Sequence, residues 1–193
     1  VITKPGSIKR FAYESLEIQK LITDGVLTMY SKTPKTKVDN LTKNSNMLYS
    51  ASGGKWLEII QAGEMETVVA SQKEGSKTIV MDERTMRLLI EDCSSLKSLL
   101  ERRSRKKVEA HNEKIDQFTK SVGNIPIVRS IELAGAAFAF GLLDIFLPNT
   151  KFARDQLLDA VLWNTKYNGC AVTEHELEEL KVFLLQRKTT KKV

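Results

Sequence analysis

Residues 63–90 have the pattern of a helix, a strand and a second helix, and this order restricts the possible fold classes more than any other part of the sequence. Residues 63–75 carry apolar side chains at helical spacing and end in Gly75, and Lys77–Met81 follows as a strand. A second helix then opens at Asp82. This succession is typical of open α/β sheets. We therefore predict an α/β fold.

The N-terminal part of the chain is predicted to add one helix and one strand. Ser7 can cap a helix that Gly25 ends, and Val26–Tyr30 suits a short strand. Lys32–Asn46 is rich in Lys, Thr and Asn and has no periodicity, which indicates an exposed loop. A helical turn is expected around Trp56.

The C-terminal half is predicted to continue the alternation of helices and strands. Ile125–Val128 supplies a strand, Ser130 begins an apolar helix, and residues 152–163 are amphipathic. Tyr167–Val172 is expected to form a short edge strand. Residues 173–176 have the spacing of a capping box for a last helix.

One domain with a helical extension accounts for the length of 193 residues. We place an α/β domain at residues 1–147 and a C-terminal helical extension at residues 148–193, with a disordered basic tail. Residues 94–122 are strongly charged and carry only a thin apolar stripe. This pattern indicates a charged helical excursion from the main body.

Composition and motifs exclude several classes of protein. With 28% charged and 41% hydrophobic residues the chain has the composition of a folded globular domain, and its longest apolar stretch is too charged to span a membrane. Two distant cysteines and two histidines argue against a disulfide framework and a multi-histidine zinc site. The sequence has no glycine-rich phosphate loop, so no nucleotide cofactor is expected. We predict a cytoplasmic protein with no membrane association.

Basic residues concentrate at two places in a chain of net charge +6. Such runs form either a solvated helix face or a surface for phosphate groups. The first group, called the basic set below, is the candidate nucleic-acid-binding surface and comprises Lys97, Arg102, Arg103, Arg105, Lys106 and Lys107. The second lies in the tail and comprises Arg187, Lys188, Lys191 and Lys192.

Acidic residues follow expected elements at the place where a parallel sheet has its reactive crevice. Glu64 and Glu66 open one helix, and Asp82 and Glu83 leave the strand at residues 77–81. Because neighbouring positions point in different directions, one acid of each pair should face a shared site, and we favour Asp82. Such oxygen ligands suit Mg²⁺ or Mn²⁺, which can activate water for attack on a phosphodiester. Alternatively, these acids cap helices and pair with nearby cations.

Three segments of the chain resemble the PIN-domain family, in detail an archaeal branch of it. They are Gly63-Glu64-Met65-Glu66, the run from residue 78 to 87, and the run from residue 127 to 133 with the helix that follows. Their order and spacing carry the resemblance, which covers about residues 1–144. PIN proteins are typically metal-dependent ribonucleases. The resemblance implies a three-layer α/β/α fold with a central parallel sheet.

The resemblance also implies roles for single residues. Glu64 takes the place of the family's glutamate after glycine, and Asp82 takes that of the aspartate ending the next core strand. Both are thereby implied to be catalytic and to bind Mg²⁺ or Mn²⁺. Glu132 stands where a later ligand could lie, in a setting that departs from the commoner pattern. Glu66 and Glu83 are secondary acidic candidates.

The family's first strand, whose aspartate anchors the metal, has no counterpart in this sequence. The chain opens at what resembles the family's second strand, Val1–Thr3. Either the sequence is a piece of a longer protein, or the domain cannot bind metal in the usual way. We favour the first explanation, because a missing strand would leave a costly unpaired sheet edge.

Together these features predict a metal-dependent ribonuclease that cleaves RNA, with the basic set following the phosphate backbone. Two alternatives stay open. One is a non-catalytic PIN-like module that only binds RNA. The other is a toxin-like PIN protein controlled by a partner, or a structural homo-oligomer.

Overall fold

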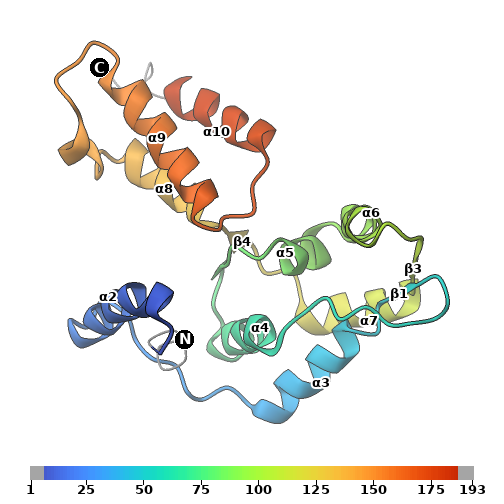
Figure 1. Ribbon diagram of the computed structural model, residues 1–193. Helices are drawn as coiled ribbons and strands as arrows, with labels where there is room; N and C mark the ends of the chain where they lie inside the picture. Colours follow the sequence, from blue (N-terminus) through green and yellow to red (C-terminus); the bar gives the residue numbers. More distant parts are fainter. Residues whose placement is uncertain (1–6, 187–193) are drawn as a thin grey trace. The chain divides into compact units, whose positions relative to one another are not determined.

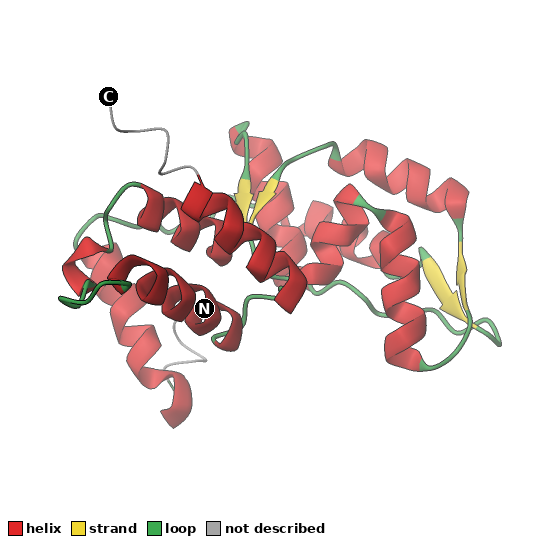
Figure 2. Ribbon diagram, turned by 90° about the horizontal axis from the view of Figure 1, so that it is seen from above, coloured by secondary structure: helices red, strands yellow, loops and turns green. Residues whose placement is uncertain are grey.

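The computed structural model describes residues 7–186, and these residues are mostly helical, so the predicted three-layer α/β/α fold with a central parallel sheet is wrong (Figures 1 and 2). Strands in the described part form only two short pairs. β1 (Tyr49–Ala51) pairs antiparallel with β3 (Val108–Ala110), and β2 (Ile79–Val80) pairs parallel with β4 (Ile127–Val128). Strands this short cannot form a continuous layer for helices to cover on both faces.

Two compact units make up the chain, residues 1–33 and residues 34–193. The first contains the 3₁₀ turn η1 (Lys9–Phe11) and α2 (Ala12–Thr23). The helix predicted after Ser7 is confirmed, but residues 26–30 form no strand. The expected strand at residues 1–3 and the basic tail from residue 187 onward lie outside the described residues.

The second unit holds most of the helices. In chain order they are α3 (Lys35–Ser45), α4 (Ala62–Glu74), α5 (Arg84–Glu91), α6 (Cys93–Ser104), α7 (Asn112–Val122), α8 (Ser130–Ala139), the 3₁₀ turn η2 (Asp144–Phe146), α9 (Ala153–Tyr167) and α10 (Glu174–Gln186). The helices predicted at residues 63–75, 82–90 and 152–163 and after Ser130 are confirmed. Over residues 7–186, every helix is too short or too polar to cross a membrane.

Two local predictions between residues 32 and 60 are wrong. The polar segment at residues 32–46 is not a loop but contains α3, because Val38 and Leu41 are spaced to bury one side of a helix. The segment around Trp56 is extended rather than helical. It is held there by the side chain of Asn46, whose Oδ1 accepts hydrogen bonds from the backbone N–H groups of Ile59 and Ile60 at 2.7 and 2.9 Å.

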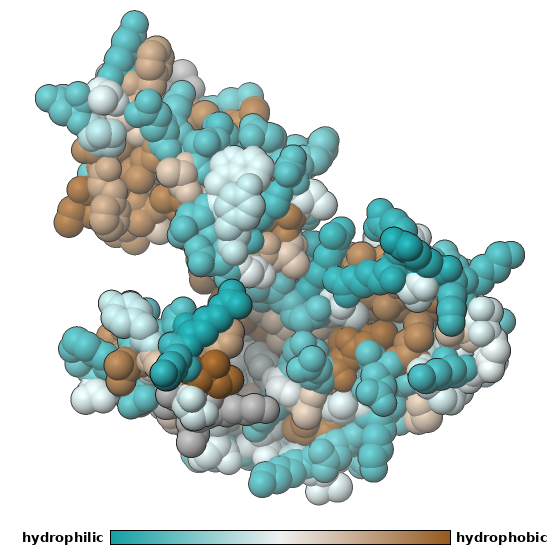
Figure 3. All heavy atoms as spheres, in the orientation of Figure 1, coloured by the Kyte–Doolittle hydropathy of each residue, from teal (hydrophilic) through white to brown (hydrophobic). Residues whose placement is uncertain are grey.

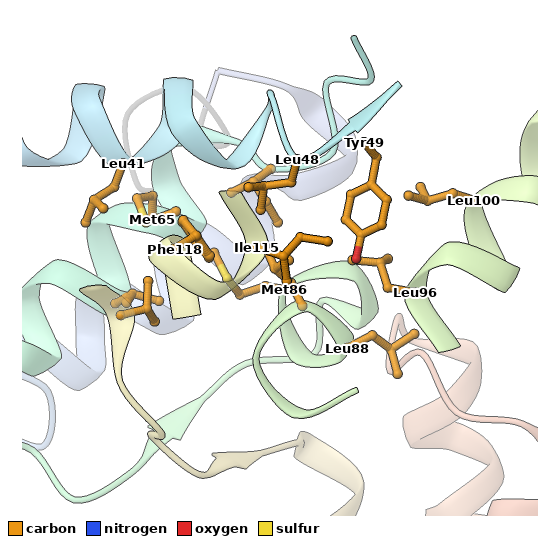
Figure 4. Close-up of a cluster of buried hydrophobic side chains, with 14 of the residues drawn as sticks. Leu41, Leu48, Tyr49, Met65, Met86, Leu88, Leu96, Leu100, Ile115 and Phe118 are labelled. Carbon is orange, nitrogen blue, oxygen red and sulfur yellow. The ribbon is translucent and has the colours of Figure 1, made fainter. Parts of the chain in front are cut away.

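The larger hydrophobic core draws on α3 to α7 and on three of the strands. In Figure 4 the ring of Tyr49 extends from β1 toward Leu96 and Leu100 of α6, and its hydroxyl donates to the backbone carbonyl of Cys93 at 3.1 Å. Phe118 of α7 is buried in the same core. Residues 94–122 are therefore no excursion from the main body. Their apolar stripe looked thin because it is divided between two helices joined through β3.

A second hydrophobic core lies among α8, α9 and α10. Its buried side chains include Ile131 and Phe138 of α8, Leu158 of α9 and Leu177 of α10. This core begins directly after β4, so α8 belongs with the C-terminal helices and not with the segment before residue 147. The predicted edge strand at residues 167–172 is wrong, since Tyr167 ends α9 and residues 168–172 belong to the turn between α9 and α10.

Candidate functional site

The carboxyl ends of β2 and β4 lie side by side, as expected for parallel strands. The backbone N–H of Met81 donates to the carbonyl of Val128 at 2.9 Å, which continues the pairing to the strand ends. Asp82 follows one strand, and Arg129 follows the other. The sequence predicted an acidic site at such a rim, and the structure places Asp82 there.

The carboxylate of Asp82 accepts hydrogen bonds from Ser130, the first residue of α8. Its Oδ1 accepts hydrogen bonds from the backbone N–H of Ser130 at 2.8 Å and from the Ser130 hydroxyl at 2.9 Å. Partial burial raises the pKa of Asp82, but these hydrogen bonds and the positive charge of Arg129 outweigh burial and lower it. Asp82 is thus an ionised acid that satisfies an orphan N–H group of a helix start.

A buried arginine joins two acids beside Asp82. Arg129 is 9% exposed, and its Nε donates to Glu132 Oε1 at 3.0 Å while its Nη1 donates to Glu176 Oε1 at 3.1 Å. Glu132 also accepts from the backbone N–H of Arg129 at 2.7 Å, so it closes the capping box of α8. The negative charges around Arg129 raise its pKa against the opposing effect of burial.

Glu176 links this cluster to two further elements. It accepts hydrogen bonds from the backbone N–H and the hydroxyl of Thr173 at 2.8 and 2.7 Å, which confirms the predicted capping box of α10. Arg87 of α5 also approaches it, with Nη2 3.5 Å from Glu176 Oε1. Partial burial raises the pKa of Glu176, but the hydrogen bonds from Thr173 and the charge of Arg129 lower it to about 2.

The other predicted acids cap α4 and α5. Glu64 accepts a hydrogen bond from the backbone N–H of Gln61 at 2.9 Å, and Glu83 accepts one from Met86 at 2.6 Å. Burial raises the pKa of Glu64 against that hydrogen bond, and the negative charge of Glu83 raises it further. Glu66 is exposed on α4. Glu64 and Glu83 are therefore electrostatic neighbours.

The predicted metal ligands do not converge on one position. Asp82 and Glu132 both serve the start of α8, while Glu64 and Glu83 serve other helices. Within residues 7–186 no group of three or more His, Cys, Asp or Glu side chains is arranged to hold a metal ion. Glu64, Asp82 and Glu132 each accept a hydrogen bond at the start of a helix, as in the capping alternative that the sequence left open.

Arg129, the centre of the cluster, was not among the predicted site residues. Its signal is weak, because a lone arginine before a helix start has no characteristic spacing. Glu176 was recognised only as a capping residue. Its ion pair with Arg129 depends on α10 lying against the start of α8, and no local pattern in the sequence encodes that packing.

The basic set lies on α6 and on the turn between α6 and β3. All its members are exposed except Lys97, which is half-buried. Arg103 donates a hydrogen bond to the hydroxyl of Thr85 at 3.3 Å. In the described part of the chain, none of the six forms an ion pair with an acid. Figure 3 shows hydrophilic side chains over this part of the surface.

Arg105 has an unusual backbone conformation. It ends α6 with φ at 53°, and it is the one residue other than glycine within residues 7–186 that has a positive φ. Glycine is the usual residue at this position of a helix end, because a side chain there costs about 1 kcal/mol. The chain thus holds a cation where a neutral glycine would be more stable.

Comparison of the chain with protein-family models, with curated proteins and with solved structures returned no match. The resemblance to PIN domains therefore stays a prediction.

Proposed function

We propose that this protein binds RNA through the basic set. The observation that carries the proposal is the group of six cationic side chains on α6 and its C-terminal turn, none of which forms an ion pair with an acid within residues 7–186. A polyanion gains affinity from such a surface by releasing its condensed counterions.

The backbone at Arg105 supports the same proposal. Strain at a non-glycine residue is retained where the side chain has a use that outweighs the loss of stability. Arg105 lies between Arg103 and Lys106, so its guanidinium extends the cationic surface beyond the end of α6. A guanidinium can also donate two parallel hydrogen bonds to one phosphate.

The test measures the affinity of two charge-matched variants for a labelled oligouridylate over a range of salt concentrations. The first variant carries Arg102→Gln, Lys106→Gln and Lys107→Gln. The control carries Lys35→Gln, Lys37→Gln and Lys43→Gln, which remove three exposed lysines from α3. None of the six side chains is buried, so both proteins should fold.

We expect the first variant to bind weakly and the α3 control to bind like the unmodified protein. The slope of log affinity against log salt should fall by about 2 in the first variant, since each lost contact to a single strand removes roughly 0.7. Equal affinities for the two variants would contradict the proposal, because binding would then depend on net charge alone.

Metal-dependent cleavage of RNA stays a separate prediction. Of the two predicted catalytic acids, Glu64 is the one to substitute, because Asp82 accepts two hydrogen bonds from Ser130 and its loss is expected to destabilise the fold. The experiment incubates RNA with the protein and MnCl₂, and repeats it with Glu64→Gln and with Glu66→Gln, the exposed neighbour. Cleavage that only Glu64→Gln abolishes would support a nuclease, and no cleavage by the unmodified protein would leave a binding module.

A cytoplasmic location is part of the same proposal. Cys93 and Cys170 are both free thiols, and burial raises the pKa of each. Free thiols persist in a reducing compartment.

A further inference from the structure

The exposed tryptophan Trp56 lies on the outer face of the β1–β3 pair. Ser50 of β1 is opposite Glu109 of β3 on one side and opposite Trp56 on the other. Residues directly opposite one another in antiparallel strands point to the same face. Tyr49 and Val108 point to the other face and are buried in the larger core. Trp56 and Glu109 therefore project away from that core.

Three side chains form a small aromatic platform on this face. The ring of Trp56 lies 4.7 Å from that of His111, at an interplanar angle of 52°, and the ammonium of Lys114 lies 4.4 Å above the Trp56 ring. The His111 ring is held by a hydrogen bond of 3.1 Å between its Nε2 and the hydroxyl of the buried Ser50. Trp56 itself is 39% exposed. Solvent thus reaches the Trp56 ring, and the His111 ring beside it is held in place by Ser50.

The platform adjoins the basic set. The backbone N–H of Ser52 donates to the carbonyl of Lys107 at 3.1 Å, and that of Ala51 donates to the carbonyl of Lys55 at 2.8 Å. These bonds place the turn at residues 51–56 beside the turn that leads into β3. By the alternation of extended residues, Lys107 shares the outer face with Glu109 and Trp56.

We propose that Trp56 is a stacking site for one base of single-stranded RNA whose phosphates contact the basic set. This inference rests on the proposed function and narrows it to single strands. A base inside a duplex has both faces covered by its neighbours, so it cannot stack on Trp56, whereas an unpaired base can. The exposed lysine Lys114 moves off the ring when the base arrives, and its ammonium is then free to contact a phosphate.

The experiment uses the Trp163→Phe protein, in which Trp56 is the remaining tryptophan of two. It is titrated with an oligouridylate and with an RNA duplex of equal length, and both tryptophan fluorescence and affinity are measured. We expect the single strand to quench Trp56 and the duplex to leave it unchanged. In the unmodified background, Trp56→Ala should weaken single-strand binding by roughly 5- to 100-fold, and Trp56→Phe should weaken it less.

The outcomes separate this inference from the proposed function. Binding of the single strand without quenching, or an equal loss of single-strand and duplex affinity in Trp56→Ala, would overturn stacking while RNA binding stands. Failure of both RNAs to bind at low salt would overturn the proposed function. The fluorescence titration needs no substitution at Trp56, so the test holds even if Trp56→Ala does not fold.

Discussion

Asp82 and Ser130, 48 residues apart in sequence, are joined by two hydrogen bonds of 2.8 and 2.9 Å. The bonds connect the end of β2 with the first residue of α8, and so connect the larger core with the helices of the second core. An acid that resembles a metal ligand in sequence here completes a helix start. Substitution of Asp82 should therefore change the free energy of unfolding first.

Asp82→Ala should destabilise the protein by about 1–3 kcal/mol, because it removes two charge-assisted hydrogen bonds and leaves the N–H of Ser130 unpaired. Asp82→Asn should cost less, since the amide keeps an acceptor oxygen. Urea unfolding monitored by circular dichroism measures both, with the exposed Asp39→Ala on α3 as control. Equal stability of Asp82→Ala and Asp39→Ala would show that the bonds contribute nothing.

Glu176 should make the protein sensitive to acid. Its pKa is lowered from 4.5 to about 2 in the folded state, so its contribution to stability is complete above pH 4.5 and is lost as the pH falls toward 2. Glu176→Gln should therefore be less stable at neutral pH and should lose less stability on acidification. Urea unfolding at a series of pH values tests this, and parallel curves for the two proteins would contradict it.

Glu64→Gln should change stability at neutral pH in the direction opposite to Glu176→Gln. Because the pKa of Glu64 is raised, its charged form opposes folding, and its favourable contribution is lost as the pH rises through that pKa. Glutamine keeps an acceptor for the Gln61 N–H and removes the repulsion by Glu83. We expect the stability of Glu64→Gln at neutral pH to be unchanged or higher.

A separate measurement tests metal binding by Glu64. If millimolar MnCl₂ raises the Tm of the unmodified protein but not that of Glu64→Gln, Glu64 is a metal ligand.

Arg105→Gly should stabilise the protein and weaken RNA binding together. Glycine adopts the positive φ of this position without strain, which should add about 0.5–1 kcal/mol to the free energy of unfolding. The lost guanidinium should lower affinity several-fold. Arg105→Ala is the matched control, since it removes the charge and keeps the strain. Equal stability of the glycine and alanine variants would contradict the strain argument.

Several helices could be predicted from the local spacing of apolar residues, and their ends could be predicted from the residues that cap them. The glycine after α4 and the capping box at Thr173 were readable because the hydrogen bonds involved join residues within one helical turn. The polar helix α3 was missed because its burial depends on two apolar residues whose partners lie elsewhere in the chain. The strands predicted at residues 77–81 and 125–128 lie where expected. Only two residues of each strand pair with the other, which is too few to build a large central sheet.

Local patterns in the amino-acid sequence are enough to locate most helices of the second unit and the segment that carries an excess of cations. The groups that the acids contact depend on the packing of distant elements, because a carboxylate at a strand end can serve equally well as a metal ligand or as a helix cap. For Asp82 the neighbouring donor is Ser130, brought within hydrogen-bonding distance by the pairing of β2 with β4. The same applies to Trp56, whose position beside the basic set arises from strand pairing across more than 50 residues of sequence.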